Sequence, residues 1–128
     1  LAASRPWIDD AFSAPTIPEI AARLRARPEP EASATADLMA ELSPTGMAVT
    51  LEAVRRARGL PDLRAALEQE YAIVMWFGAT QPDLVEGIRA QLVDKDRNPS
   101  WRPARAEDVT AETVASAFVH VPPVPLWT

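Results

Sequence analysis

The stretch from Pro82 to Trp101, PDLVEGIRAQLVDKDRNPSW, combines a helix with a polar loop. Proline is tolerated in the first turn of a helix, where its missing N–H is harmless, so a helix is expected to open this stretch. Leu84, Ile88 and Leu92 recur at four-residue spacing, as on one helical face. Charged and turn-forming residues then fill positions 93–103. We predict a helix through about residue 92, followed by a turn-rich polar loop.

Proline and capping residues divide the rest of the chain into further helical segments. No window alternates apolar and polar residues over a useful length, and hairpin turns of the Asn-Gly or Asp-Gly kind are absent. The other expected helices span residues 5–12, 17–26, 29–42, 44–58, 61–77 and 111–119. The sequence therefore predicts an all-α chain of about seven helices.

Three hydroxyl side chains are expected to cap helices. Thr16 is followed three residues later by Glu19, which is a capping-box pattern. Ser43 precedes Pro44, and Thr110 precedes the last helix. Apolar spacing also predicts two buried faces. These are Met47, Leu51 and Val54 on one helix and Leu63, Leu67, Tyr71 and Val74 on the next.

Five consecutive apolar residues, Ile73 to Phe77, leave every side of one helix apolar. Such a segment must be surrounded on all sides. Either it forms the domain's own core, or part of it faces a partner such as the rest of a longer chain or a neighbouring subunit.

Composition excludes several classes of function. Thirteen basic and eighteen acidic residues give a net charge of −5, which argues against a nucleic-acid or anionic-membrane partner. There is no cysteine, so disulfides and thiolate chemistry are excluded, and a cytoplasmic location is expected. One histidine, His120, cannot build a histidine-rich metal site, and no metal or cofactor is expected. The chain starts at Leu1, without a methionine, and reads as a piece of something longer.

The segment from Asp83 to Trp101 resembles the C-terminal signature of 3-hydroxyisobutyryl-CoA hydrolases, in the crotonase superfamily. Members read aspartate-phenylalanine, one variable residue, and glutamate-glycine-valine-arginine-alanine. A hydrophobic pair, aspartate-lysine-aspartate and proline-x-tryptophan follow. Here Leu84 replaces the phenylalanine and Ile88 replaces the valine, so both positions stay apolar.

Three further blocks agree in order and spacing, so the resemblance covers essentially the whole chain. Ser43-Pro-Thr45, followed by Val49-Thr-Leu51, is similar to the family's serine-proline-threonine helix start, with Gly46 where serine is usual. Glu68 to Tyr71 is similar to a glutamate-tyrosine pair before the signature, and Trp7 to Phe12 to a preceding segment.

The resemblance implies that residues 1–128 form the C-terminal helical region of an α/β crotonase-type fold. Residues 1–42 would be leading helices, and residues 43–128 would carry the signature. The oxyanion hole and catalytic carboxylates would lie in an N-terminal core before residue 1, so no catalytic residue is expected in this chain. The intact protein would hydrolyse 3-hydroxyisobutyryl-CoA in valine degradation. CoA would be part of the substrate, and the core or a neighbouring subunit would be the packing partner.

One binding residue follows from the resemblance. Related hydratases use a lysine in the loop after the glutamate-glycine helix to approach CoA phosphates, and Lys95 occupies this loop. The alternative is that Lys95 pairs with Asp94 or Asp96 in a solvated loop. Glu86 and Arg89 are expected to pair or to hold neighbouring loops. Pro99 and Trp101 are expected to pin the loop onto the helices.

Two other functions stay open from the sequence. An enoyl-CoA hydratase or isomerase of the same superfamily would share the signature. A free-standing helical interaction module, which kept the sequence of the helical cap without the enzyme, would also fit the chain's start at Leu1 and its apolar run. We favour the cap of an enzyme over a free-standing module because an isolated cap would expose surface that needs to be covered. Within the enzyme hypothesis we favour the hydrolase, a choice that depends on carboxylates in the core.

Overall fold

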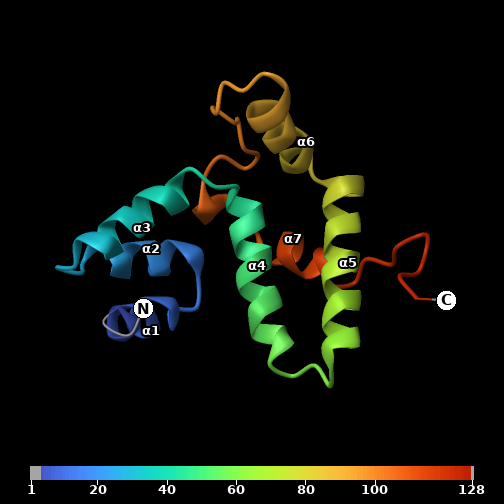
Figure 1. The fold of residues 1–128 in the computed structure, drawn as a ribbon, viewed down its shortest axis with the longest axis horizontal. Coiled ribbons are helices and arrows are strands. Elements are labelled where there is room, and N and C mark those ends of the chain that lie inside the picture. The colour runs from blue at the N-terminus through green and yellow to red at the C-terminus, as the bar shows by residue number, and fades with distance from the viewer. Residues whose placement is uncertain (1–3, 128) are drawn as a thin grey trace. The chain divides into compact units, whose positions relative to one another are not determined.

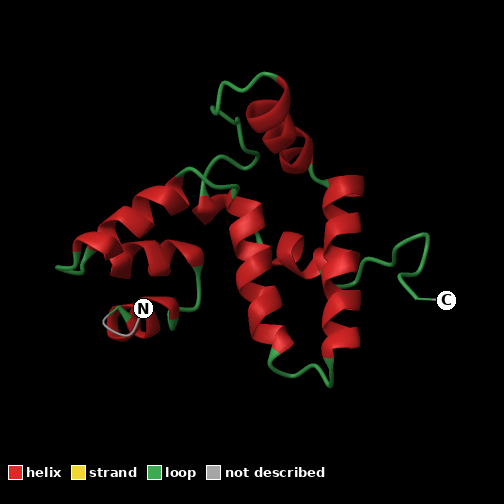
Figure 2. Cartoon of the chain, in the orientation of Figure 1, coloured by secondary structure: helices red, strands yellow, loops and turns green. Residues whose placement is uncertain are grey.

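A computed structural model describes residues 4–127, and all regular structure in this range is helical. Figures 1 and 2 show helices joined by loops, without strands in the described range. The helices are α1 (Arg5–Phe12), α2 (Ile17–Arg25), α3 (Pro30–Ala40), α4 (Pro44–Ala57), α5 (Leu63–Thr80), α6 (Pro82–Ile88) and α7 (Ala111–Ala117). A π-helical turn (Arg89–Val93) and a 3₁₀ turn (Ala106–Asp108) complete the list. The predicted all-α class is confirmed.

Contacts divide the chain into two compact units, of which the first ends at Leu42. Within it, α2 packs against both α1 and α3. Its fully or nearly fully buried apolar side chains include Trp7, Ile20 and Leu24. At the start of α2, the backbone N–H of Glu19 donates to Thr16 Oγ1 at 3.3 Å, so the predicted cap is confirmed.

The second unit, from Ser43 onward, is built on α4, α5 and α7, with α7 lying between the other two (Figure 1). Its apolar cluster is centred on Val49, Trp76 and Ala117, one from each helix. Partly buried side chains pack around these three: Ile73, Phe77, Val114 and Phe118. Ser43 and Thr110 cap α4 and α7 as predicted, by accepting from the N–H groups of residues 46 and 113.

The structure corrects both predicted faces. On α4 the buried side chains are Pro44, Thr45 and Val49, whereas Val54 is exposed. On α5, Leu63, Leu67 and Val74 are exposed, and Trp76 is the buried residue. Apolar residues occur all around these helices, so four-residue spacing alone does not identify the side that meets α7. Within the apolar run, Trp76 belongs to this unit's own core and Val74 faces outward.

Residues 118–127, after α7, have no regular structure and contact α5 at two points. Tyr71 Oη donates a hydrogen bond to the carbonyl of Val124 at 2.9 Å. The guanidinium of Arg64 lies over the Trp127 ring, 4.9 Å from its centroid. In residues 4–127, no helix is long and apolar enough to cross a membrane.

Candidate binding loop around Arg89

A buried carboxylate anchors α6 before the candidate loop begins. Asp83 is 4 % exposed and lies in the first turn of α6. It accepts a hydrogen bond from Ser43 Oγ at 2.5 Å and another from the backbone N–H of Arg102 at 2.8 Å. Asp83 thereby joins three places in the second unit: the start of α4, the start of α6 and the far end of the loop.

The helix that begins at Pro82 does not continue in α form as far as predicted. It changes to a π-helical turn at Arg89–Val93, in which the N–H of Asp94 donates to the carbonyl of Arg89 at 2.8 Å. Such wider turns occur mostly as single insertions and often at functional sites. The turn leads directly into the loop of residues 94–100.

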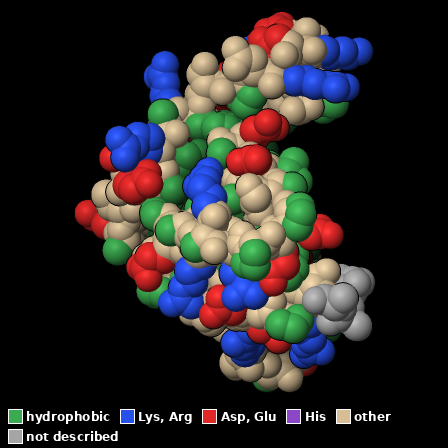
Figure 3. Space-filling model, turned by 90° about the vertical axis from the view of Figure 1, so that its left-hand side faces the viewer, with side chains coloured by type: hydrophobic (Ala, Val, Ile, Leu, Met, Phe, Trp, Pro, Cys, Tyr) green, Lys and Arg blue, Asp and Glu red, His purple; other side chains and the backbone are tan. Residues whose placement is uncertain are grey.

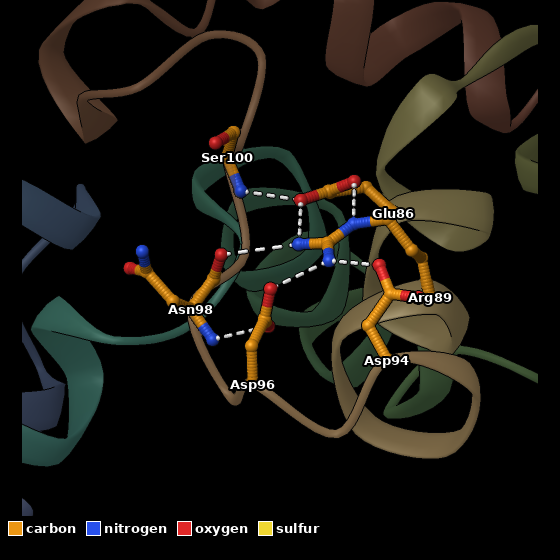
Figure 4. A network of polar contacts seen from close by, with 6 residues as sticks. All are labelled: Glu86, Arg89, Asp94, Asp96, Asn98 and Ser100. Atoms are coloured by element: carbon orange, nitrogen blue, oxygen red, sulfur yellow. Dashed lines mark hydrogen bonds and ion pairs between the residues drawn. The ribbon is translucent and has the colours of Figure 1, made fainter.

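Arg89 binds this loop with every N–H that its guanidinium possesses (Figure 4). A guanidinium has five N–H donors in a fixed planar arrangement. Nε and one Nη2 donor reach the two carboxylate oxygens of Glu86, both at 2.9 Å. The two Nη1 donors reach Asp94 and Asp96, both at 2.7 Å, and the remaining Nη2 donor reaches the carbonyl of Asn98 at 3.2 Å. We call Arg89 and these four partners the Arg89 clamp.

Two loop N–H groups complete the arrangement. The N–H of Ser100 donates to Glu86 Oε1 at 2.7 Å, and that of Asn98 donates to Asp96 Oδ1 at 2.9 Å. Figure 3 shows acidic and basic side chains together at the top of the view, where α6 and this loop lie. The predicted pairing of Glu86 with Arg89 and their hold on a neighbouring loop are confirmed.

The clamp favours the ionised forms of Glu86 and Asp96. Hydrogen bonds from Arg89, and then from the backbone of Ser100, lower the pKa of Glu86 to about 2. Hydrogen bonds from Arg89 and from the backbone of Asn98 likewise lower the pKa of Asp96. The same carboxylates raise the pKa of Arg89, Glu86 first. At neutral pH Glu86, Asp96 and Arg89 therefore all carry their charges.

The loop backbone is strained at two positively charged residues. Lys95 and Arg97 have positive φ values of 58° and 55°. In this left-handed region, the backbone of a residue other than glycine is roughly 1–2 kcal/mol less stable than in the right-handed region. Such conformations persist only where the surroundings impose them. Here the N–H of Arg97 donates to the carbonyl of Ala90 at 3.1 Å, and the clamp holds the carboxylates on either side of Lys95.

Lys95 itself is exposed, and the structure corrects one reading of it. Asp94 and Asp96, its expected ion-pair partners, are both bound by Arg89. Among residues 4–127, Lys95 forms no ion pair. Its exposed side chain is thus not held by either neighbouring aspartate. In the sequence, the only sign that Asp94 and Asp96 would both bind Arg89 is their spacing of two residues, which can place both side chains on one side of the backbone.

Trp101 packs the end of the loop against α6. A Cβ atom added at Gly87 would lie 3.3 Å from Trp101 Cη2, closer than a side chain comfortably approaches. The glycine is therefore what allows the half-buried indole to rest on the helix. This contact agrees with the expectation that Trp101 pins the loop.

An apolar face of the same helical segment is left open. Val85 is 67 % exposed and Leu92 is 68 % exposed, with Ile88 between them also exposed. Their spacings of three and four residues place them on one side of the helix. A contiguous exposed apolar face is typical of a surface that contacts another protein segment.

The family follows from a comparison with known proteins. The model of the family described as enoyl-CoA hydratase/isomerase matches residues 1–118. The chain belongs to this family. The crotonase-superfamily resemblance of the Asp83–Trp101 signature is confirmed, because curated hydrolases and solved structures of the superfamily agree with it. The Arg89 clamp is therefore a feature of an enoyl-CoA hydratase/isomerase family member.

Curated members of the family show which part is matched. A probable 3-hydroxyisobutyryl-CoA hydrolase 2 from Arabidopsis thaliana is 38 % identical over 120 residues, covering 89 % of this chain and 32 % of the relative. The mitochondrial 3-hydroxyisobutyryl-CoA hydrolase from Mus musculus is 35 % identical over 111 residues, covering 87 % and 28 %. The chain spans about a third of the length of these relatives.

Two solved structures share the fold. A carnitinyl-CoA dehydratase from Mycobacterium thermoresistibile has a TM-score of 0.87 and 46 % identity, covering 95 % of this chain and 34 % of that one. An enoyl-CoA hydratase from Rhodobacter sphaeroides 2.4.1 has a TM-score of 0.86 and 37 % identity, covering 94 % and 35 %. These helices thus correspond to about a third of larger family members.

Proposed function

We propose that the protein containing this chain hydrolyses the thioester of 3-hydroxyisobutyryl-CoA, a step in valine degradation. The observation that carries the proposal is the match to curated 3-hydroxyisobutyryl-CoA hydrolases over nearly nine tenths of the chain. The Asp-Lys-Asp signature lies inside the matched length. The reaction adds water across the thioester and releases 3-hydroxyisobutyrate and the free thiol of CoA.

In this proposal residues 4–127 act as a C-terminal helical cap rather than as the catalytic centre. All three carboxylates of the Arg89 clamp accept hydrogen bonds from Arg89, and Glu86 and Asp96 also accept from backbone N–H groups, which suits a structural role better than proton transfer. Acid and base groups would come from a core outside this chain. The open apolar face at Val85, Ile88 and Leu92 would pack on that core or on a neighbouring subunit.

Lys95 is the proposed contact with the substrate. It is exposed, it has no ion pair among the described residues, and its loop is held in one conformation. An ammonium of this kind suits a phosphate of the CoA nucleotide as a point charge.

Hydration of an enoyl-CoA is the second candidate function. It is favoured by the two similar solved structures, which are of a carnitinyl-CoA dehydratase and an enoyl-CoA hydratase. Both reactions use a CoA thioester and differ in what the core does to it. The helical cap alone does not separate them.

The experiment supplies the full-length protein with 3-hydroxyisobutyryl-CoA and, separately, with crotonyl-CoA. Thiol released from the first substrate is measured with a chromogenic disulfide, and hydration of the second by loss of the conjugated thioester's absorbance. Thiol release from 3-hydroxyisobutyryl-CoA is expected. Hydration without thiol release would replace the proposal with the second candidate.

The purified 128-residue chain, tested in the same assay, is expected to release no thiol above background. Release from a preparation whose mass shows the chain alone would contradict the assignment of catalysis to a separate core. A cytoplasmic location stays a prediction, since several relatives are named mitochondrial.

A further inference from the structure

The arrangement around Arg89 bears on how Lys95 would meet its ligand. Lys95 has the long, flexible side chain of every lysine, but its backbone does not have the freedom of an ordinary surface loop. The two carboxylates that flank it each accept a hydrogen bond from the Arg89 guanidinium at 2.7 Å, and the N–H of Arg97 donates to the carbonyl of Ala90 at 3.1 Å. A loop with left-handed residues at positions 95 and 97 would relax without those contacts.

The clamp also removes the competitors for the ammonium. Asp94 and Asp96 are the acidic side chains nearest to Lys95 in the sequence, and either could neutralise it. Both are turned toward Arg89, and neither forms an ion pair with the lysine (Figure 4). Arg89 therefore has two roles. It holds the backbone around Lys95, and it binds the carboxylates of Asp94 and Asp96.

We propose that Arg89 is a positioning residue for the CoA nucleotide, which it influences by holding the 94–98 loop so that Lys95 presents a free ammonium to a phosphate. This inference rests on the proposed function, from which it takes a CoA thioester as the ligand and Lys95 as its contact. Arg89 touches no substrate in it. All five of its donors are used within the protein.

The test compares two ligands that differ by the phosphorylated adenosine nucleotide. CoA carries the phosphorylated nucleotide, whereas pantetheine has the same thiol-bearing arm without it. Binding of each to the full-length protein is measured by calorimetry, and KM and kcat are measured with the two corresponding 3-hydroxyisobutyryl thioesters. A phosphate contact affects the first ligand of each pair and leaves the second unchanged.

Four variants separate positioning from general charge and from stability. Lys95→Ala and Arg89→Gln are each expected to weaken CoA binding roughly tenfold, as for the loss of one hydrogen bond to a charged group, with pantetheine binding unchanged. Arg89→Lys keeps the charge but lacks the planar set of donors, so it should resemble Arg89→Gln. Arg58→Gln removes an exposed positive charge at the end of α4 and should leave the binding of both ligands unchanged.

The double variant Arg89→Gln with Lys95→Ala decides whether the two residues act through one contact. Losses that act through one contact do not add, so the double variant should bind CoA about as weakly as either single variant. Kinetically, KM for the CoA thioester should rise while kcat changes by less than about twofold. If the fold-loss of CoA affinity in the double variant equals the product of the two single losses, the inference is wrong. An equal loss of pantetheine binding, or an Arg89→Gln protein that binds CoA normally, would also overturn it.

Failure of the proposed function has a different signature. A wild-type protein that binds CoA more tightly than pantetheine but hydrolyses no thioester would refute the hydrolase, while the binding series would still test Arg89. A protein that hydrolyses the thioester, but in which Arg89→Gln leaves the phosphate-dependent binding intact, would refute the positioning role alone.

Discussion

The apolar cluster and the Arg89 clamp hold the same unit together by opposite means. The cluster joins α4, α5 and α7 through Val49, Trp76 and Ala117, all at most 3 % exposed. The clamp joins α6 to its loop through charged groups that remain partly in water. Burial of apolar surface has no preferred direction, whereas a guanidinium accepts partners only along its five N–H bonds.

This difference separates stability from position. Exposed ion pairs add little to the free energy of folding, because water screens them and side-chain entropy opposes them. Their geometry can nevertheless fix a loop, because five acceptor atoms must each lie along an N–H bond of one planar guanidinium. We infer that the cluster keeps the unit folded and that the clamp sets the shape of one surface. Changes to the two should therefore have different consequences.

The largest expected effect is at the cluster. Trp76→Ala removes the biggest side chain of the cluster and leaves a cavity among three helices. Loss of a buried aromatic side chain typically lowers the free energy of unfolding by about 3–5 kcal/mol. Denaturant unfolding followed by circular dichroism measures this change.

Val74→Ala is the matched control for that prediction. Val74 is on the same helix, two residues away, but it is 61 % exposed. Its truncation should change the free energy of unfolding by less than about 0.5 kcal/mol. Equal losses in the two variants would mean that the outward side of α5 is covered in the protein, as the sequence reading of the apolar run allowed.

Local chemistry made much of the fold predictable. The caps at Thr16, Ser43 and Thr110 depend on one side chain and an N–H three residues later, so the sequence carries all the information they need. Which side of a helix is buried depends instead on where other helices lie. On α5 both Val74 and Trp76 are apolar, and the positions of α4 and α7 make Trp76 the buried one.

The candidate site was predictable to the same limit. The pairing of Glu86 with Arg89 follows from their spacing of three on one helix. The clamp's other partners come from a loop whose path depends on left-handed backbone at Lys95 and Arg97. Neither residue type favours that conformation, and glycine or asparagine would have signalled it. The sequence therefore identified Lys95 but not what holds it.

A second prediction uses pH to distinguish the clamp from the cluster. Because the clamp lowers the pKa of Glu86 from 4.5 to about 2, the stability it gives is present above pH 4.5 and is lost as the pH falls toward 2. Glu86→Gln removes that contribution, so its free energy of unfolding should fall less steeply than that of wild type across this window. Trp76→Ala should keep the wild-type slope, since the cluster contains no ionisable group.

Unfolding measured at several pH values between 2 and 5 tests both statements. Glu86→Gln with a slope as steep as wild type would mean that the carboxylate is not held by Arg89 in solution. A reduced slope in Trp76→Ala would mean that the cluster and the clamp do not act separately.

The smallest expected effect concerns the strain that the clamp imposes. Glycine adopts the left-handed conformation of Arg97 (φ 55°) without steric cost, but it also gives the unfolded chain more freedom. The two effects nearly cancel, so Arg97→Gly should leave Tm unchanged or raise it by less than about 5 °C. At Arg58, which ends α4 with right-handed backbone (φ −64°), only the entropic loss remains, and Arg58→Gly should lower stability by about 0.5–1 kcal/mol. If thermal unfolding shows Arg97→Gly to be as damaging as Arg58→Gly, the loop is not strained in solution. The loop would then adopt this conformation without Arg89, and the clamp, like the cluster, would contribute only to stability.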